Sequence, residues 1–319
     1  MFMQRWIGAA GAIAVALIFA GATASAQTTL RLGKAQANQF AFVPADVGAD
    51  TGIFKKHGID IEINSFTGDA KLQQAMASDS IDMALGSGPA LAFIVKGSPI
   101  KGVAAMAGPP LLLAIVVRPD GAKSVAELKD KKISVSTAGG LTYWLVSETS
   151  RRKGWGPHGI DIQPMGAMAP QLAALKRGDI DGIVMDMSNA FALEKIGEGR
   201  ILVRFNDLTD FIVHVIYASD KLIASRPEAI RGFLRGWFTT IAFMRKNKAE
   251  TVAIAKDVID KDEAVVSRTY DEVMPMYSDD GRFKASALAV LARSFVELGT
   301  LPAEPDMSKL YTEAFLSAK

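Results

Sequence analysis

The sequence predicts an α/β protein with two similar lobes and a cleft between them. The pentapeptide His-Gly-Ile-Asp-Ile occurs twice, starting at His57 and again at His158. The flanks repeat as well: a short apolar strand, a loop and a helix-like stretch precede each copy, and a helical pattern and a second Ile-Asp segment follow it. Two similar units in one chain usually form two lobes, and clefts between lobes are common binding sites for small ligands.

Residues 1–26 have the pattern of a signal peptide that is removed from the mature chain. Arg5 supplies a positive charge, residues 7–20 are apolar and uncharged, and Ala24-Ser25-Ala26 is a small-x-small cleavage pattern. An uncleaved membrane anchor is the alternative, but the apolar run falls short of the ~20 residues that span a membrane. We therefore expect cleavage near Ala26 and a periplasmic protein.

The composition excludes several classes of function. The chain has no Cys, so it has no thiolate metal sites, iron–sulfur clusters or Cys nucleophiles. It carries 36 Lys and Arg against 34 Asp and Glu, which leaves no basic excess for binding nucleic acid. Disulfides are not needed, because a chain of this length can bury a sufficient core.

Lobe 1 is expected to begin with residues 27–117, in a β-α-β-α-β order that implies a parallel sheet. Pro44 suits the first turn of a helix, and Lys55, Lys56 and Gly58 suit its end. Alternating or continuous apolar runs predict the strands, at residues 30–34, 59–63, 80–85, 101–107 and 111–117. Helices are predicted at residues 44–54, 70–77 and 90–95.

Lobe 2 is expected at residues 118–213, starting after the turn at Arg118-Pro119-Asp120-Gly121. Its predicted strands are residues 133–136, 180–185 and 201–205, and the second His-Gly-Ile-Asp-Ile repeats the order of the first. Its predicted helices are residues 124–128, 141–153, 170–176 and 190–196. The strand predicted at 211–218 should carry the chain back, so that residues 214–319 return to lobe 1. Ile230, Phe233 and Trp237 belong to one apolar stripe in the C-terminal helices.

Ligands of parallel α/β sheets bind beyond the carboxyl ends of the strands, which selects the loops there. Ser87, Thr137 and Thr142 precede or begin helices, where they could contact a polar ligand or act as ordinary N-caps. Asp186 ends a strand, so binding a ligand and capping the next helix are equally good interpretations. Phe40 and Tyr143 could pack on a ligand.

Catalytic and metal sites are not indicated. His57 and His158 lie beside turn glycines at expected helix ends, and His214 lies in the returning strand, where a core or hinge position is expected. No HxH or HExxH spacing, GxSxG elbow or GxxxxGK[ST] loop occurs. We expect no enzyme activity, no cofactor and no metal.

Several motifs resemble those of one family of exported proteins. They include Asp50-Thr-Gly-Ile-Phe-Lys-Lys-His-Gly-Ile-Asp-Ile, Ser80-Ile-Asp-Met-Ala-Leu-Gly-Ser, Gly178-Asp-Ile-Asp-Gly and Arg226-Pro-Glu-Ala-Ile-Arg-Gly-Phe-Leu. The chain resembles the periplasmic substrate-binding proteins of ABC importers in the nitrate, sulfonate, taurine and thiamine-precursor group. The resemblance covers nearly the whole mature chain in order.

This resemblance implies a type II periplasmic-binding fold, with two sheets flanked by helices, that closes on its ligand. It implies a monomer that captures a small polar or anionic solute and delivers it to an ABC permease and its ATPase. The family's pocket loops fall on Asn38, Gln39, Thr67, Gly68, Ser87, Thr137, Gly139, Gly140, Thr142 and Asp186.

Gly88, Met185 and Met187 depart from the pattern of sulfonate-binding relatives, so the class of ligand stays open. The alternative functions are an enzyme on the same fold, similar to a pyrimidine-precursor synthase, and a periplasmic sensor subunit.

Overall fold

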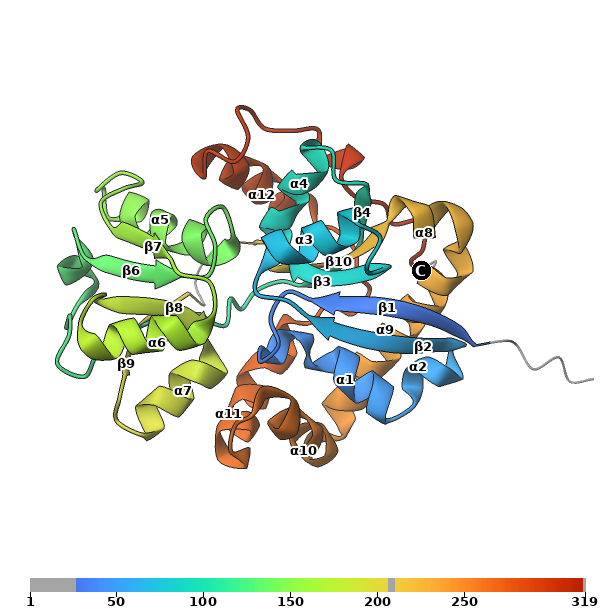
Figure 1. The fold of residues 1–319 in the computed structure, drawn as a ribbon, viewed down its shortest axis with the longest axis horizontal. Helices are drawn as coiled ribbons and strands as arrows, with labels where there is room; N and C mark the ends of the chain where they lie inside the picture. The colour runs from blue at the N-terminus through green and yellow to red at the C-terminus, as the bar shows by residue number, and fades with distance from the viewer. Residues whose placement is uncertain (1–26, 206–209, 318–319) are drawn as a thin grey trace, which may run out of the picture.

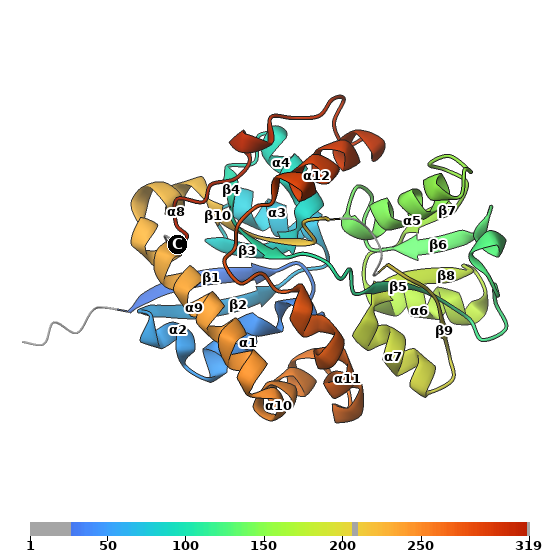
Figure 2. The same cartoon turned by 180° about the vertical axis from the view of Figure 1, so that it is seen from behind.

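The computed structural model describes residues 27–205 and 210–317. The proposed signal peptide, residues 1–26, lies outside them. The described chain forms two five-stranded sheets that lie end to end, each with helices on both faces (Figures 1 and 2). We call the first sheet with its helices lobe 1 and the second sheet with its helices lobe 2.

The two sheets share one strand order, as the internal repeat predicts. The first is ordered β2-β1-β3-β10-β4 and the second β7-β6-β8-β5-β9. In each, only the fourth strand runs antiparallel to its neighbours. The strands of the first sheet are β1 (Thr28–Lys34), β2 (Ile59–Ser65), β3 (Met83–Ser87), β4 (Ile100–Ala107) and β10 (His214–Ser219). Those of the second are β5 (Leu113–Val117), β6 (Lys132–Val135), β7 (Asp161–Pro164), β8 (Gly182–Asp186) and β9 (Arg200–Arg204).

The repeat extends to single hydrogen bonds. Asp82 Oδ2 accepts from the backbone N–H of Arg31, and Asp181 Oδ2 accepts from that of Lys132, both at 2.9 Å. The backbone N–H of each aspartate donates in turn to the carbonyl of the same partner at 2.8 Å. These two aspartates therefore tie corresponding strand starts together.

The predicted crossing between the lobes needs correction. Residues 111–117 are predicted to complete lobe 1, but β5 lies in the second sheet and pairs with β8 and β9. The chain therefore crosses before this strand and not after it. All five residues of β5 are buried, and an unbroken apolar run does not reveal which of two sheets will bury it. The return crossing brings β10 between β3 and β4.

Helices cover both sheets, and most predicted helices are present. In lobe 2 they are α5 (Leu141–Arg152), α6 (Met168–Arg177) and α7 (Met187–Lys195). In lobe 1 they are α1 (Val43–Asp50), α2 (Ile53–Lys56), α3 (Asp69–Ala77), α4 (Ala92–Val95), α8 (Asp220–Ser225), α9 (Pro227–Lys246), α10 (Lys248–Ile259), α11 (Glu263–Val273) and α12 (Ala285–Glu297). Short 3-10 turns lie at Phe40–Phe42, Gly88–Leu91, Val125–Leu128, Met274–Met276 and Met307–Lys309.

The prediction of a single helix at residues 44–54 is wrong, because the structure has two helices there. The predicted helix is divided into α1 and α2 because Gly52 adopts φ +66°, a left-handed conformation that ends the first helix.

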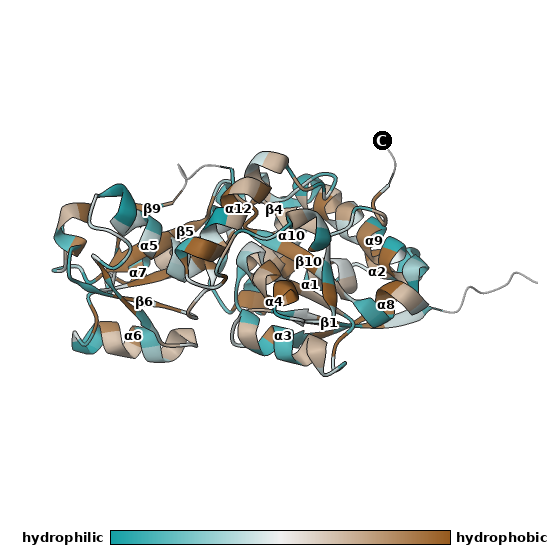
Figure 3. Cartoon of the chain, turned by 90° about the horizontal axis from the view of Figure 1, so that it is seen from above, coloured by the Kyte–Doolittle hydropathy of each residue, from teal (hydrophilic) through white to brown (hydrophobic). Residues whose placement is uncertain are grey.

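The long helix α9 packs against α1 and α2 on lobe 1. Phe233 and Trp237 are fully buried, and Phe233 stacks on Phe54 with ring centres 5.1 Å apart. The apolar stripe read from the sequence is therefore the core-facing side of this helix. In Figure 3 the surface helices alternate between hydrophilic and hydrophobic colour along their length, as expected for helices that cover a sheet.

Candidate functional site

A cavity of about 120 Å³ lies between the two lobes, at the carboxyl ends of the parallel strands. Both sheets contribute to its wall, as their shared strand order requires: the ends of β3 and β8 reach it from opposite sides. Six of the predicted site residues line it: Asn38, Gln39, Gly68, Ser87, Thr142 and Asp186.

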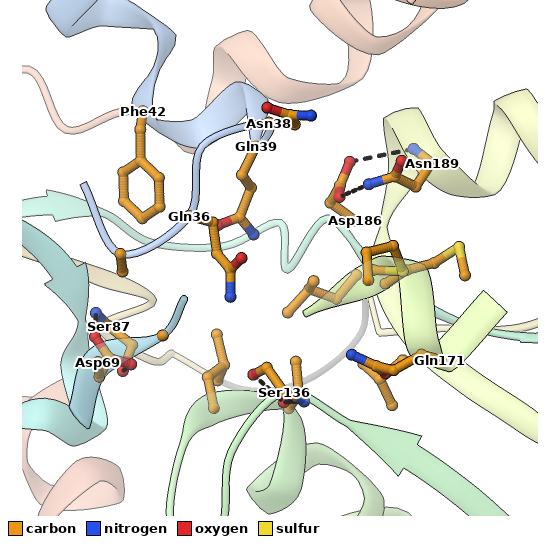
Figure 4. A pocket seen from close by; sticks show the side chains of 18 of the residues that line it. Gln36, Asn38, Gln39, Phe42, Asp69, Ser87, Ser136, Gln171, Asp186 and Asn189 are labelled. Atoms are coloured by element: carbon orange, nitrogen blue, oxygen red, sulfur yellow. Dashed lines mark hydrogen bonds between the residues drawn. The ribbon is translucent and has the colours of Figure 1, made fainter. Parts of the chain in front are cut away.

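The loop after β1 supplies three amide side chains to the wall. Gln36, Asn38 and Gln39 follow β1 before the turn at Phe40–Phe42, and Phe42 adds an aromatic ring. Figure 4 shows the amides of Gln36 and Gln39 side by side and pointing into the cavity. The strand-end rule predicts the loop from Gln36 to Phe40 as part of the site, and Phe42 lies beyond that range.

Ser87 and Asp69 form the next part of the lobe 1 wall. Asp69 is the first residue of α3, and its carboxylate accepts from the backbone N–H of Ser87 at 2.9 Å and from its hydroxyl at 2.7 Å. The Ser87 carbonyl accepts from the buried hydroxyl of Tyr217 at 2.6 Å. Burial raises the pKa of Asp69 against the lowering effect of these bonds with Ser87. Ser87 is thus a fixed part of the wall, and the sequence did not identify Asp69 as its partner.

Lobe 2 contributes hydroxyl and amide side chains that are fixed by hydrogen bonds within this lobe. Thr142, in the first turn of α5, lies 3.1 Å from the Ser136 hydroxyl. Gln171 Oε1 accepts from the Ser134 hydroxyl at 2.9 Å, and its Nε2 donates to the Gly166 carbonyl at 2.8 Å. Ser136 and Gln171 were not predicted, because neither has a sequence signal that separates it from other polar residues on helices and loops.

Asp186 caps α7, which is one of the two interpretations of its position. Its carboxylate accepts from the backbone N–H of Ser188 at 3.0 Å and of Asn189 at 3.2 Å. It also accepts from the Ser188 hydroxyl and from Asn189 Nδ2, the latter at 2.6 Å. Asp186 still lines the cavity, together with Asn189 (Figure 4). Because the cap begins at Asp186, α7 starts three residues earlier than the helix predicted at 190–196.

Six other predicted residues lie outside the wall of this cavity. Phe40 is 1% exposed and packs edge-to-face on Tyr270 in the core of lobe 1. Thr67 is exposed and Tyr143 is half-buried. Thr137, Gly139 and Gly140 line a neighbouring hollow that faces residues 298–300, because α5 begins only at Leu141 and its preceding loop turns outward.

His214 lines the cavity, although the sequence predicted only a core or hinge position for it. It opens β10 beside Ser87, is 5% exposed, and packs edge-to-face on Phe42. Its Nδ1 is buried and has no hydrogen-bond partner within the described chain. Burial lowers the pKa of His214 to about 4, against a smaller raising effect of the Gly86 backbone, so the ring is neutral at pH 7.

The described residues contain no group of three or more His, Asp or Glu placed to hold a metal ion. Across the same ranges, none of the helices combines the length and apolar character that crossing a membrane requires.

The same architecture occurs in several periplasmic binding proteins. An alkanesulfonate-binding protein, SsuA, from Xanthomonas axonopodis pv. citri superposes with a TM-score of 0.78 at 19% identity, covering 89% of this chain and 98% of that chain. The periplasmic nitrate-binding protein NrtA from Synechocystis PCC 6803 gives a TM-score of 0.71 at 16% identity, with 90% and 87% covered. The fold is therefore the two-lobed type II periplasmic-binding fold.

The sequence comparisons agree. A relative from Brucella abortus (strain 2308), provisionally named a binding protein, is 24% identical over 303 residues, which cover 86% of this chain and 87% of the relative. The family model described as NMT1/THI5 like matches residues 39–251. This match spans more than half of the chain, and the protein belongs to the NMT1/THI5-like family.

Proposed function

We propose that this protein is the solute-binding subunit of an ABC importer. It captures a small polar organic solute in the periplasm, after export directed by residues 1–26, and presents the closed form to a membrane permease and its ATPase. The observation that carries this proposal is the polar cavity enclosed between the lobes, whose wall includes Gln39 and Ser87 from one lobe and Thr142 and Asn189 from the other. A ligand that touches both lobes binds the closed state preferentially, and this difference in affinity drives closure.

The contacts of Ser87 make it a fixed part of the cavity wall. Its hydroxyl and its backbone N–H donate to the two carboxylate oxygens of Asp69. Nothing in the described structure favours the enzyme or the sensor alternative. We propose a monomer, because the cavity is complete within one chain.

The proposal is tested with protein purified from the periplasm. Native mass spectrometry should show a small co-purified solute, and the unfolded and refolded protein should be stabilised by about 2.7 kcal/mol when that solute is added at about 100 times its dissociation constant. Gln39→Ala should weaken binding at least about tenfold, a loss of about 1.4 kcal/mol.

Asn64→Ala, at an exposed position on β2, is the matched control and should bind normally. Recovery of a chemically altered solute after incubation would instead identify an enzyme. Equal affinity of Gln39→Ala and the control would show that the solute binds elsewhere.

A further inference from the structure

The formal charges around the cavity are unusual for a receptor of anions. Among the described residues of its wall there is no Lys and no Arg, and the two carboxylates are Asp69 and Asp186. His214 adds no positive charge at pH 7, since burial keeps its ring neutral. An anionic solute would therefore meet two carboxyl groups and no full positive charge.

Four helix starts reach the same cavity and balance these carboxylates. The first residues of α3, α5 and α6 line it, and α7 reaches it through its N-cap Asp186 and through Asn189 in its first turn. Each helix start carries a partial charge of about +0.5, so the four together offset about two negative charges. Asp186 already occupies the N–H groups at the start of α7. The cavity is close to electroneutral, which suits a solute without net charge.

The polar groups left free for a ligand include the side-chain amides of Gln36 and Gln39. Figure 4 shows no hydrogen bond between the side-chain amide of Gln36 or Gln39 and the other residues drawn, and both amides point into the cavity. Each amide offers a donor and an acceptor next to each other. His214 also belongs to this wall, but its Nδ1 is fully buried and offers no accessible surface to a ligand.

We propose that the cavity selects an electroneutral solute with adjacent hydrogen-bond donor and acceptor groups, of the carboxamide, urea or lactam type, and discriminates against oxyanions. This inference rests on the proposed receptor function and names the class of solute. The paired amides of Gln36 and Gln39 hold the donor–acceptor edge, and Phe42, Leu113 and Met185 contact the apolar part.

The test uses pairs of compounds that share one carbon skeleton and differ only in charge. Each carboxamide is compared with its carboxylate, and each sulfonamide with its sulfonate, by isothermal titration calorimetry on the mature protein. We expect the neutral member of a binding pair to bind at least about tenfold more tightly, because the anion gains no compensating cation. Tighter binding of the carboxylates or sulfonates would overturn the inference and leave the receptor function standing.

The charge of the co-purified solute tests the same inference independently of the paired compounds. A neutral solute supports the inference, and an anionic one overturns it. If no solute co-purifies and no compound in the panel binds, the receptor function itself fails, which is a separate result.

A designed charge provides a second readout. Gln36→Lys places a cation in the wall and should raise affinity for the anionic member of a pair by about tenfold while weakening the neutral one. Gln36→Glu, of nearly the same shape, should weaken the anion further. The control is Asn64→Lys, which adds the same charge at an exposed site on β2 outside the cavity. Unchanged preference in Gln36→Lys would overturn the inference.

Discussion

The guanidinium carbon of Arg268 lies 3.5 Å from the centre of the Phe191 ring. Arg268 belongs to α11 of lobe 1 and Phe191 to α7 of lobe 2, so this contact crosses the cleft. Arg204 faces the same ring at 5.6 Å. Three ion pairs accompany the stack: Lys195–Asp262 at 2.9 Å, Arg204–Glu272 at 3.0 Å, and Arg268–Glu194 at 3.8 Å. Together they fasten the lobes on one side of the cavity.

Arg268→Ala should shift the protein towards an open form. The substitution removes a cation–π contact worth about 0.5–2 kcal/mol and the ion pair with Glu194. Solute affinity should therefore fall several-fold, and the radius of gyration without solute should rise. Small-angle X-ray scattering and calorimetry measure the two effects. Arg293→Ala, at an exposed position on α12, is the control. A mutant as compact as the control would show that the stack does not hold the lobes together.

Asp186→Ala should destabilise lobe 2 through the loss of the α7 cap. Asp186 accepts from the backbone N–H groups of Ser188 and Asn189, and removing such a cap costs about 1 kcal/mol. Urea unfolding measures the change. Asp186→Asn should retain most of the stability, because asparagine caps helices about as well as aspartate. Equal losses in the two variants would contradict the capping role.

His214 should make the protein less stable in mild acid. Its pKa is about 4 in the folded protein against 6.5 for a free side chain, so the unfolded chain takes up the proton first as the pH falls. The stabilising contribution is present above about pH 6.5 and is lost progressively towards pH 4, by up to about 3 kcal/mol. Asp69, whose pKa burial raises, acts in the opposite direction.

The measurement is the free energy of unfolding at pH 7 and pH 4.5 in the wild type and in His214→Gln. The difference between the two proteins isolates the histidine from the carboxylates. A pH dependence that is the same in both would exclude His214 as its source.

Asp46→Ala should be among the most damaging substitutions in lobe 1. Its carboxylate accepts two bonds from the buried ammonium of Lys34, at 2.9 and 3.0 Å. Burial raises the pKa of Asp46, against the lowering effect of Lys34. Removing one partner of a buried pair leaves an uncompensated charge and costs about 3–5 kcal/mol.

The double variant Lys34→Met, Asp46→Leu should lose much less, because it leaves neither charge behind. Urea unfolding of the single and double variants decides this. If the double variant were as unstable as Asp46→Ala, the unpaired charge of Lys34 would not explain the loss of stability in Asp46→Ala.

The local sequence determined the elements and their repetition. Each of these features is a regular pattern in the sequence. They are the duplicated His-Gly-Ile-Asp-Ile, the alternation of apolar and polar residues in the strands, and the helical spacing of the apolar residues that include Phe233 and Trp237. The loops at the strand ends could be placed from the sequence for the same reason, since parallel strands of one sheet end at one edge.

Only the tertiary structure decided which side chains face one another across the cavity. The residues of β5 are uniformly apolar, so nothing local assigns this strand to the second sheet. His214 is neutral because it is buried beside Phe42. The N–H groups at the start of α7 are occupied because the Asp186 side chain accepts hydrogen bonds from them. Pairing across lobes, burial and the resulting charge balance are properties of distant segments brought together, and they leave no periodic trace in the sequence.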